Sequence, residues 1–163
     1  MNATKVFLGV VLSMLLAEAL GQDGGIAFRS IQLNRTGCLG SCPVYSVTVE
    51  ADGSVRFVGD EYVAQLGTHE SKVAPEAVAR LQSELKKAAF FSLRSRKKGR
   101  LGCLRAKSDH PSVVVRTVTP TDDKTVSFYT GCPETKDSAA LVKLADAIDE
   151  IANTANWIGS EQL

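Results

Sequence analysis

The sequence has few aromatic residues and very few histidines. Aromatic residues make up 6% of its 163 residues, and two histidines are present. Two histidines exclude a multi-histidine metal site, although a mixed site with cysteine stays possible. Neither sign of charge predominates, because 19 lysines and arginines face 18 acids, which excludes the strong positive field of a general nucleic-acid-binding protein. The remaining figures, 44% hydrophobic and 23% charged residues, are those of one ordinary globular domain.

Motifs of catalysis are also missing from the sequence. It contains no H-E-x-x-H zinc motif, no G-x-S-x-G nucleophile elbow and no glycine-rich phosphate loop. No pair of carboxylates is singled out by its local spacing. Residues far apart in the chain can still form a catalytic triad, so these absences do not exclude an enzyme. The sequence therefore favours a non-catalytic protein, and it predicts no cofactor and no bound metal.

Residues 1–21 have the pattern of a cleavable secretory signal. An apolar run over 6–16 follows one lysine, and residues 17–21 supply the small-x-small pattern that signal peptidases accept. The alternative is an uncleaved membrane anchor, but a span needs about 20 apolar residues, and Glu18 interrupts the run. We expect a secreted or periplasmic protein whose mature part, residues 22–163, forms a single domain without a transmembrane helix.

Alternating apolar and polar residues predict several short strands in the mature chain. The clearest hairpin signal is the Asp52-Gly53 turn between two alternating runs. A second hairpin is predicted around residues 120–123. The expected strands cover 26–33, 44–50, 55–58, 62–66, 113–118 and 125–129.

Two segments instead repeat apolar residues at helical spacing. The first is a helix of about 14 residues that starts at Pro75, a residue that suits the first helical position. The second covers residues 136–153, where Asp146, Asp149 and Glu150 fall off the apolar stripe. The expected fold is α+β: an antiparallel sheet of about five to six strands, with both amphipathic helices packed on one face.

Four cysteines in an exported chain point to two disulfides. Glycines beside and within the Cys38–Cys42 segment allow a tight loop, and Cys103 and Cys132 flank the second predicted hairpin. We favour the pairs Cys38–Cys42 and Cys103–Cys132, with a crossed pairing as the alternative. A four-thiolate zinc site or a redox-active Cys38–Cys42 dithiol are two further alternatives.

The first cysteine pair lies in a segment with a recognisable pattern, R-x-x-C-x-G-x-C-P-x-Y, over residues 35–45. This segment resembles the signature of an uncharacterised exported bacterial family, domain of unknown function 6438. The likeness continues through Asp52-Gly53, the 108–111 step before a strand, the 128–132 segment and a closing helix before Trp157. Leu39 stands where the family more often has an aromatic residue. The resemblance implies a fold and an exported setting, but no reaction.

Two clusters are candidate binding sites. Arg35 precedes the first cysteine loop, and Asp109-His110 precedes a strand; if the two segments meet, Arg35, Tyr45, Asp109 and His110 form a polar cluster that can bind an anion. Alternatively, Arg35 pairs with Asp109 to hold the loop, and the Tyr45 ring packs on the core.

The second candidate is a basic loop without acids between residues 94 and 107, which contains Arg94, Arg96, Lys97, Lys98, Arg100, Arg105 and Lys107. Such a loop can contact anionic lipid head groups or envelope polymers. The alternative is a solvated loop kept open by self-repulsion. The loop contains no aromatic residue, which argues against base stacking and single-stranded nucleic acid as a partner.

Together these patterns predict an exported, non-catalytic binding or structural module of the cell envelope, whose partner is an unidentified envelope component or protein. The alternative is a thiol-redox or metal-binding protein that uses Cys38 and Cys42.

Overall fold

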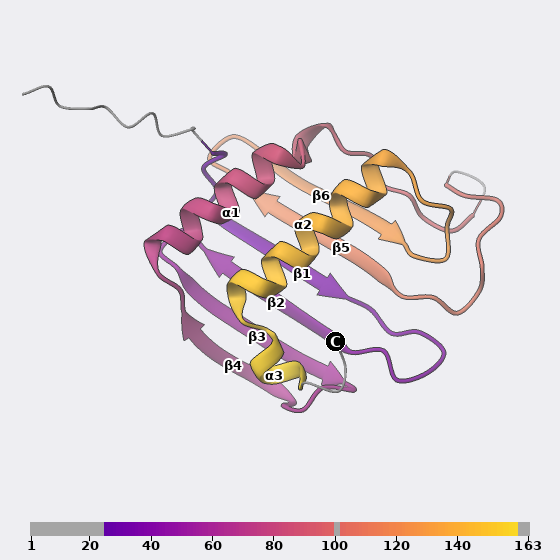
Figure 1. Cartoon of the computed structure of the whole chain (residues 1–163), viewed down its shortest axis with the longest axis horizontal. Coiled ribbons are helices and arrows are strands. Elements are labelled where there is room, and N and C mark those ends of the chain that lie inside the picture. The colour runs from indigo at the N-terminus through magenta and orange to yellow at the C-terminus, as the bar shows by residue number, and fades with distance from the viewer. Residues whose placement is uncertain (1–24, 100–101, 160–163) are drawn as a thin grey trace, which may run out of the picture.

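The computed structural model describes residues 25–99 and 102–159; the predicted signal segment, 1–21, lies outside this range. The described residues form one six-stranded sheet in the order β4-β3-β2-β1-β5-β6, with every neighbouring pair antiparallel (Figure 1). The elements are β1 Ser30–Arg35, β2 Val44–Glu50, β3 Ser54–Glu61, β4 Gly67–Lys72, α1 Pro75–Lys87, η1 Phe90–Ser92, β5 Ser112–Val118, β6 Asp123–Tyr129, α2 Lys136–Ala152 and α3 Ala155–Ile158. The predicted α+β class is confirmed.

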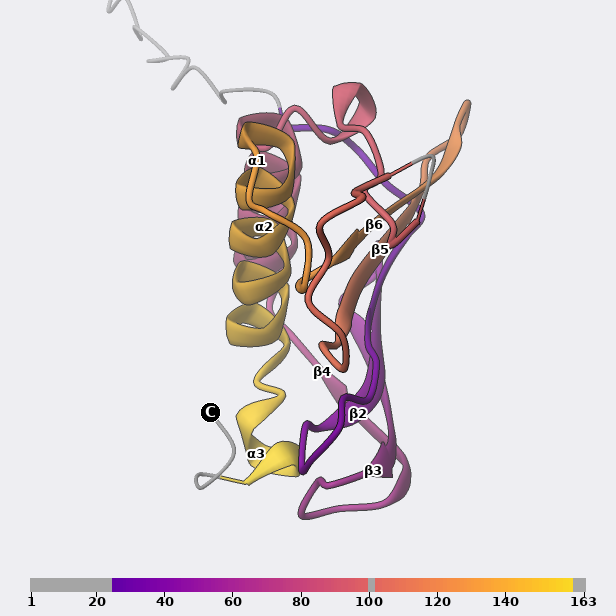
Figure 2. The same cartoon turned by 90° about the vertical axis from the view of Figure 1, so that its right-hand side faces the viewer.

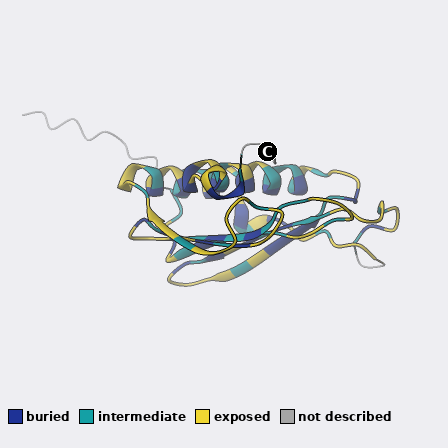
Figure 3. Ribbon diagram, turned by 90° about the horizontal axis from the view of Figure 1, so that it is seen from below, coloured by how far each residue is buried: buried dark blue, intermediate teal, exposed yellow. Residues whose placement is uncertain are grey.

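The helices cover one face of the sheet, and the core lies between the two layers (Figure 2). Alternation within the strands directs one set of side chains toward α1 and α2, for example Ile31 and Leu33 of β1, which are fully buried. The helices present Leu81, Leu85 and Leu144 to this layer. Buried residues accordingly concentrate on the facing sides of the two layers (Figure 3). Among the described residues, no helix is long and apolar enough to cross a bilayer.

Local signals begin and end the two long helices. Pro75 occupies the first turn of α1, and Thr135 and Ser138 form a reciprocal capping box at the start of α2. Asn153 ends α2 in the left-handed conformation. The turn that follows leads into the short helix α3, which the sequence analysis did not predict.

Two strand predictions need correction. Residues 62–66 are not a strand: Tyr62 has a φ of 52°, and the segment is a connection whose Ala64 amide donates to the carbonyl of Ile158. The edge strand β4 begins afterwards, and its sequence gave no signal because an edge strand exposed on most positions needs no apolar alternation. The first strand starts at Ser30, since the amide of Ile26 donates instead to the carbonyl of Gln82 in α1.

One end of the sheet gathers most of the irregular chain. The ends of β1, β3 and β6 and the starts of β2, β4 and β5 all lie there, as their register requires. We call this region the loop end; it consists of residues 36–43, 61–66, 103–111 and 130–132. Both disulfides, Cys38–Cys42 and Cys103–Cys132, form within it, in the pairing that the sequence favours.

Candidate functional site

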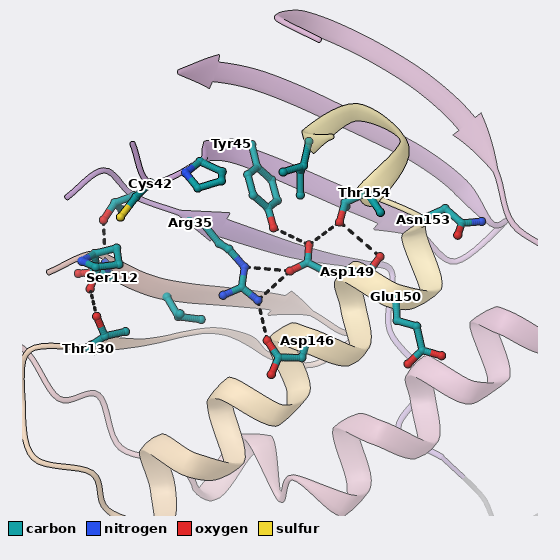
Figure 4. Close-up of a pocket in the computed structure, with 16 residues that line it drawn as sticks. Arg35, Cys42, Tyr45, Ser112, Thr130, Asp146, Asp149, Glu150, Asn153 and Thr154 are labelled. Carbon is teal, nitrogen blue, oxygen red and sulfur yellow. Dashed lines mark hydrogen bonds and ion pairs between the residues drawn. The ribbon is translucent and has the colours of Figure 1, made fainter. Parts of the chain in front are cut away.

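A cavity of about 650 Å³ opens near the loop end, between the sheet and the last turns of α2 (Figure 4). Strands β1, β2 and β5 supply one wall, and α3 supplies another through Ala155 and Ile158. Its volume falls within the range of small-molecule sites. The cavity is lined by Arg35, Thr36, Cys42, Pro43, Tyr45, Pro111, Ser112, Val113, Thr130, Asp146, Asp149, Glu150, Asn153, Thr154, Ala155 and Ile158.

Asp149 organises the polar part of this cavity. Its carboxylate accepts hydrogen bonds from Arg35 Nε at 2.9 Å, from the Tyr45 hydroxyl at 2.8 Å and from the Thr154 hydroxyl at 2.9 Å. Arg35 Nη2 also lies 2.7 Å from Asp149 and donates to Asp146 at 2.8 Å. The Asp149 side chain is 13% exposed, whereas that of Asp146 is 62% exposed. The Asp149 carboxylate is thus largely buried and accepts from three side chains, whereas the Asp146 carboxylate stays open to solvent.

The strands explain why Arg35 and Tyr45 meet. Arg35 follows Leu33 by two positions, so it continues the helix-facing side of β1, and Tyr45 is its direct partner across the β1–β2 pair. At this end of the sheet the core gives way to the cavity. Asp146 and Asp149 are three positions apart on α2 and therefore project from the same side of the helix.

Burial and charge shift two pKa values in this network. Burial is the largest influence on Arg35 and opposes its charged form. The charge of Asp149, the neighbouring Tyr45 and the hydrogen bonds to Asp149 and Asp146 together outweigh burial, so the pKa of Arg35 lies above its usual value. Burial and then the negative charge of Asp149 raise the pKa of Tyr45. Arg35 is therefore charged and Tyr45 neutral throughout the physiological range.

The raised pKa of Tyr45 predicts a loss of stability in alkali. An unfolded tyrosine ionises near pH 10 while folded Tyr45 keeps its proton, so the stability linked to Tyr45 is complete below about pH 10 and decreases as the pH rises further. Urea unfolding between about pH 8 and pH 11 should show a shallower decline for Tyr45→Phe than for the wild type, because phenylalanine cannot ionise. Parallel declines in the two proteins would contradict this assignment.

The lining carries an excess of negative charge. Three carboxylates, those of Asp146, Asp149 and Glu150, accompany one guanidinium, that of Arg35. Arg80 of α1 pairs with Glu150 from outside the lining at 2.8 Å. No basic residue occupies the last turn of α2, although the carbonyl end of a helix favours cations. With Arg80 counted, three carboxylates face two guanidinium groups, so the charged groups at the cavity keep a net charge of −1.

The predicted polar cluster forms only in part. Arg35 and Tyr45 line the cavity, but Asp109 and His110 are absent from its lining. The two loops do meet, because the Leu39 amide donates to the Asp109 carbonyl at 3.1 Å. The alternative pairing of Arg35 with Asp109 is wrong, since the acids that hold Arg35 come from α2.

Sequence reasoning missed both of those acids as site residues. Asp146 and Asp149 follow Arg35 by 111 and 114 positions, and no local pattern joins segments so far apart. Their one sequence signal is that two acids three positions apart border an apolar helical stripe.

The two disulfides lie in different surroundings. Cys42 lines the cavity, while Cys103 and Cys132 are buried in the core cluster. The described residues contain no group of three or more His, Cys, Asp or Glu that could hold a metal ion.

The basic loop passes along the outer edge of β6, where the Arg96 amide donates to the Ser127 carbonyl. Arg100 lies outside the described residues.

Comparison with known families gives a match over most of the chain. The model of a family described as "Domain of unknown function (DUF6438)" matches residues 29–152. The chain belongs to the DUF6438 family. This DUF6438 match runs from just before β1 to the end of α2, so it includes Arg35, Tyr45, Asp146 and Asp149. No curated protein matches the sequence.

Membership confirms the resemblance seen in the sequence, but it assigns no reaction to the DUF6438 domain. Any function of the chain therefore has to reside in its own cavity and surface.

Proposed function

We propose that the chain is an exported, non-catalytic binding module of the cell envelope, and that its cavity takes a small organic cation with an apolar body. The cavity itself carries the proposal: about 650 Å³, walled by Pro43, Pro111, Val113 and Ile158, with carboxylates at one side. Sites for small ligands combine such apolar walls with a few placed polar groups.

The cationic group of the ligand would lie against Asp146 and Glu150. Both side chains are more than half exposed, so a ligand can reach them beside their present partners, Arg35 for Asp146 and Arg80 for Glu150. Arg35 is already held by two carboxylates, which makes it a weak receptor for a further anion. Tyr45 stays neutral and supports Asp149 from the sheet side.

Export is supported by the signal-like pattern of residues 1–21 and by the two disulfides. Disulfides persist in the periplasm and outside the cell and are rare in the cytosol of most organisms.

Thiol–disulfide exchange at Cys38–Cys42 is the second candidate function. One observation favours it: Cys42 lines the cavity, so a bound disulfide substrate would lie against that sulfur. The segment that follows is strand β2 rather than a helix N-terminus, however, and the helix dipole that lowers a thiol pKa in redox proteins is missing. The cation-binding proposal is better supported.

Benzylamine and its neutral counterpart benzyl alcohol test the ligand class. We expect benzylamine to shift the backbone NMR signals of Thr36, Ser112 and Thr130, which line the cavity, and benzyl alcohol to bind at least about fivefold more weakly. The double variant Asp146→Asn, Glu150→Gln should weaken benzylamine about tenfold, since each exposed ion pair contributes up to about 1 kcal/mol.

A matched variant, Glu70→Gln with Glu76→Gln, removes two exposed acids that do not line the cavity and should leave benzylamine binding unchanged. Equal binding of the two probes, or shifts that avoid the cavity residues, would overturn the proposal.

A further inference from the structure

The exposed large apolar side chains of the described residues all lie at the loop end. They are Leu39, Tyr62, Leu66 and Leu104, and the two most exposed are Leu39 and Leu104 at 83% each. Single exposed leucines are ordinary on a protein surface. Here, however, all four lie at one end of the sheet, and none lies at the opposite end among the described residues. Such clustering is typical of a surface that binds a partner.

Disulfides hold the two most exposed leucines in place. Leu39 lies inside the loop that Cys38 and Cys42 close, and its amide is bonded to the Asp109 carbonyl. Leu104 directly follows Cys103, which is joined to Cys132 at the end of β6. Both leucines are therefore presented on tethered backbone, which reduces the entropy lost when they are immobilised by a partner.

Basic residues precede and follow Leu104 in the sequence. Those that precede it lie beside the loop end, because the Cys103 amide donates to the Lys97 carbonyl and Lys98 pairs with Cys103. Arg94, Lys97, Lys98, Arg105 and Lys107 are exposed, and Arg96 is half-buried. Within the described part of the chain none of these six forms an ion pair, although Lys98 lies 5.9 Å from the centre of the Tyr129 ring. The charge of the five exposed residues is thus available to an external anion.

Acids at and near the loop end lie outside the basic stretch 94–107. The carboxylates of Asp146, Asp149 and Glu150 line the cavity on the helix side, and Glu134 is exposed two positions after Cys132. Asp60 and Glu61 lie at the end of β3, which β2 and β1 separate from β5. Asp109 lies in the loop before β5, and Asp137 in α2 accepts a hydrogen bond from the Arg94 amide. At the loop end, positive charge is therefore confined to residues 94–107, the stretch that contains Leu104, and Leu39 contacts the loop that follows it through the Asp109 carbonyl. Figure 2 shows the molecule from this end, with the 36–43 and 103–111 loops in front of the strands.

We propose that the loop end docks on an anionic lipid surface, with Leu39 and Leu104 entering the head-group region and the basic side chains contacting lipid phosphates. Charge attracts the domain to the surface, and apolar insertion holds it there. A dissolved polyanion would satisfy the lysines and arginines but would leave both leucines in water. Tyr62 and Leu66 at the same end extend the apolar contact beyond the basic side.

Vesicle flotation tests this proposal directly. The purified, disulfide-bonded chain should float with vesicles of phosphatidylcholine containing phosphatidylglycerol and remain behind with phosphatidylcholine alone. Each lysine near an anionic surface strengthens binding about fivefold, so Lys97→Glu with Lys98→Glu should weaken binding by at least about twentyfold. Leu39→Ser with Leu104→Ser should weaken it about tenfold or more through lost apolar insertion.

Control variants separate charge from position. Lys72→Glu with Lys143→Glu makes the same change in net charge away from the loop end and should bind within about twofold of the wild type. All proteins carry the same N-terminus, so differences between them do not come from that segment. Both leucines are exposed, so serine there removes little packing, and the thermal unfolding of each variant verifies the fold.

Three outcomes would overturn the proposal. Equal binding to vesicles with and without phosphatidylglycerol would remove the role of charge. Unchanged binding by Leu39→Ser with Leu104→Ser, together with equal retention on a heparin column, would identify a soluble polyanion as the partner. Absence of flotation for the wild type would exclude a lipid surface altogether.

Discussion

Alanine in place of Asp149 is expected to destabilise the folded chain by about 3 to 5 kcal/mol. The Asp149 carboxylate is 13% exposed and accepts from Arg35, Tyr45 and Thr154, which join two strands to the end of α2. Its removal leaves the partly buried Arg35 guanidinium with the exposed Asp146 alone and deprives the Tyr45 hydroxyl of its acceptor. Urea unfolding followed by the fluorescence of Trp157, the one tryptophan of the chain, measures the change.

Asp146→Ala is the matched control for this prediction. Asp146 also binds Arg35, but its side chain is 62% exposed, so its loss should change the free energy of unfolding by less than about 1 kcal/mol. Asp149→Asn keeps the shape of the side chain and removes the charge, and we expect about 2 kcal/mol of destabilisation. Similar small losses in all three variants would show that the Arg35 network contributes no more than a surface ion pair.

Much of the fold was predictable because its signals are local. Pro75 and the apolar spacing that follows it predict α1, which ends at Lys87 in the structure, and the second helix is predicted to within one residue. The alternation over 44–50 predicts β2, and Asp52-Gly53 predicts its turn. Each of these segments buries one face. Apolar residues therefore recur in the sequence at the spacing of a helix or a strand.

The errors have physical causes. β4 pairs with one neighbour at the sheet edge and exposes most of its side chains, so nothing in Gly67–Lys72 had to alternate. The apolar residues of 62–66 resembled a strand, but Leu66 and Tyr62 are exposed in the structure and the backbone turns at Tyr62. Exposed apolar residues outside the core were thus mistaken for part of it.

The candidate site was half predictable for a similar reason. Arg35 and Tyr45 lie within one short segment whose residue pattern draws attention to both. Their acidic partners depend on where α2 crosses the sheet, which is set by tertiary packing rather than by any segment alone. The one trace of Asp149 in the sequence is its place as a polar residue at the border of the apolar stripe of α2.

Removing the buried disulfide should have a second large effect on stability. Cys103→Ser with Cys132→Ser opens a loop whose ends are 29 positions apart, and the loop-closure relation gives about 3.6 kcal/mol at 25 °C. Both sulfurs lie in the core cluster, so the two serine hydroxyls would also be buried, which increases the loss. Folded domains of this size are stable by about 5 to 15 kcal/mol, so the variant should unfold at markedly lower urea.

The Cys38–Cys42 bridge supplies the internal comparison. Its cysteines are four positions apart and half-exposed, so Cys38→Ser with Cys42→Ser should cost about 2 kcal/mol by the same relation. Urea unfolding of both double variants without reductant compares the two bridges under one condition. A larger loss for Cys38–Cys42 than for Cys103–Cys132 would show that loop length does not set the contribution of these bridges. Because Cys42 lines the cavity, that result would instead make the cavity wall itself the part of the fold that the short bridge stabilises.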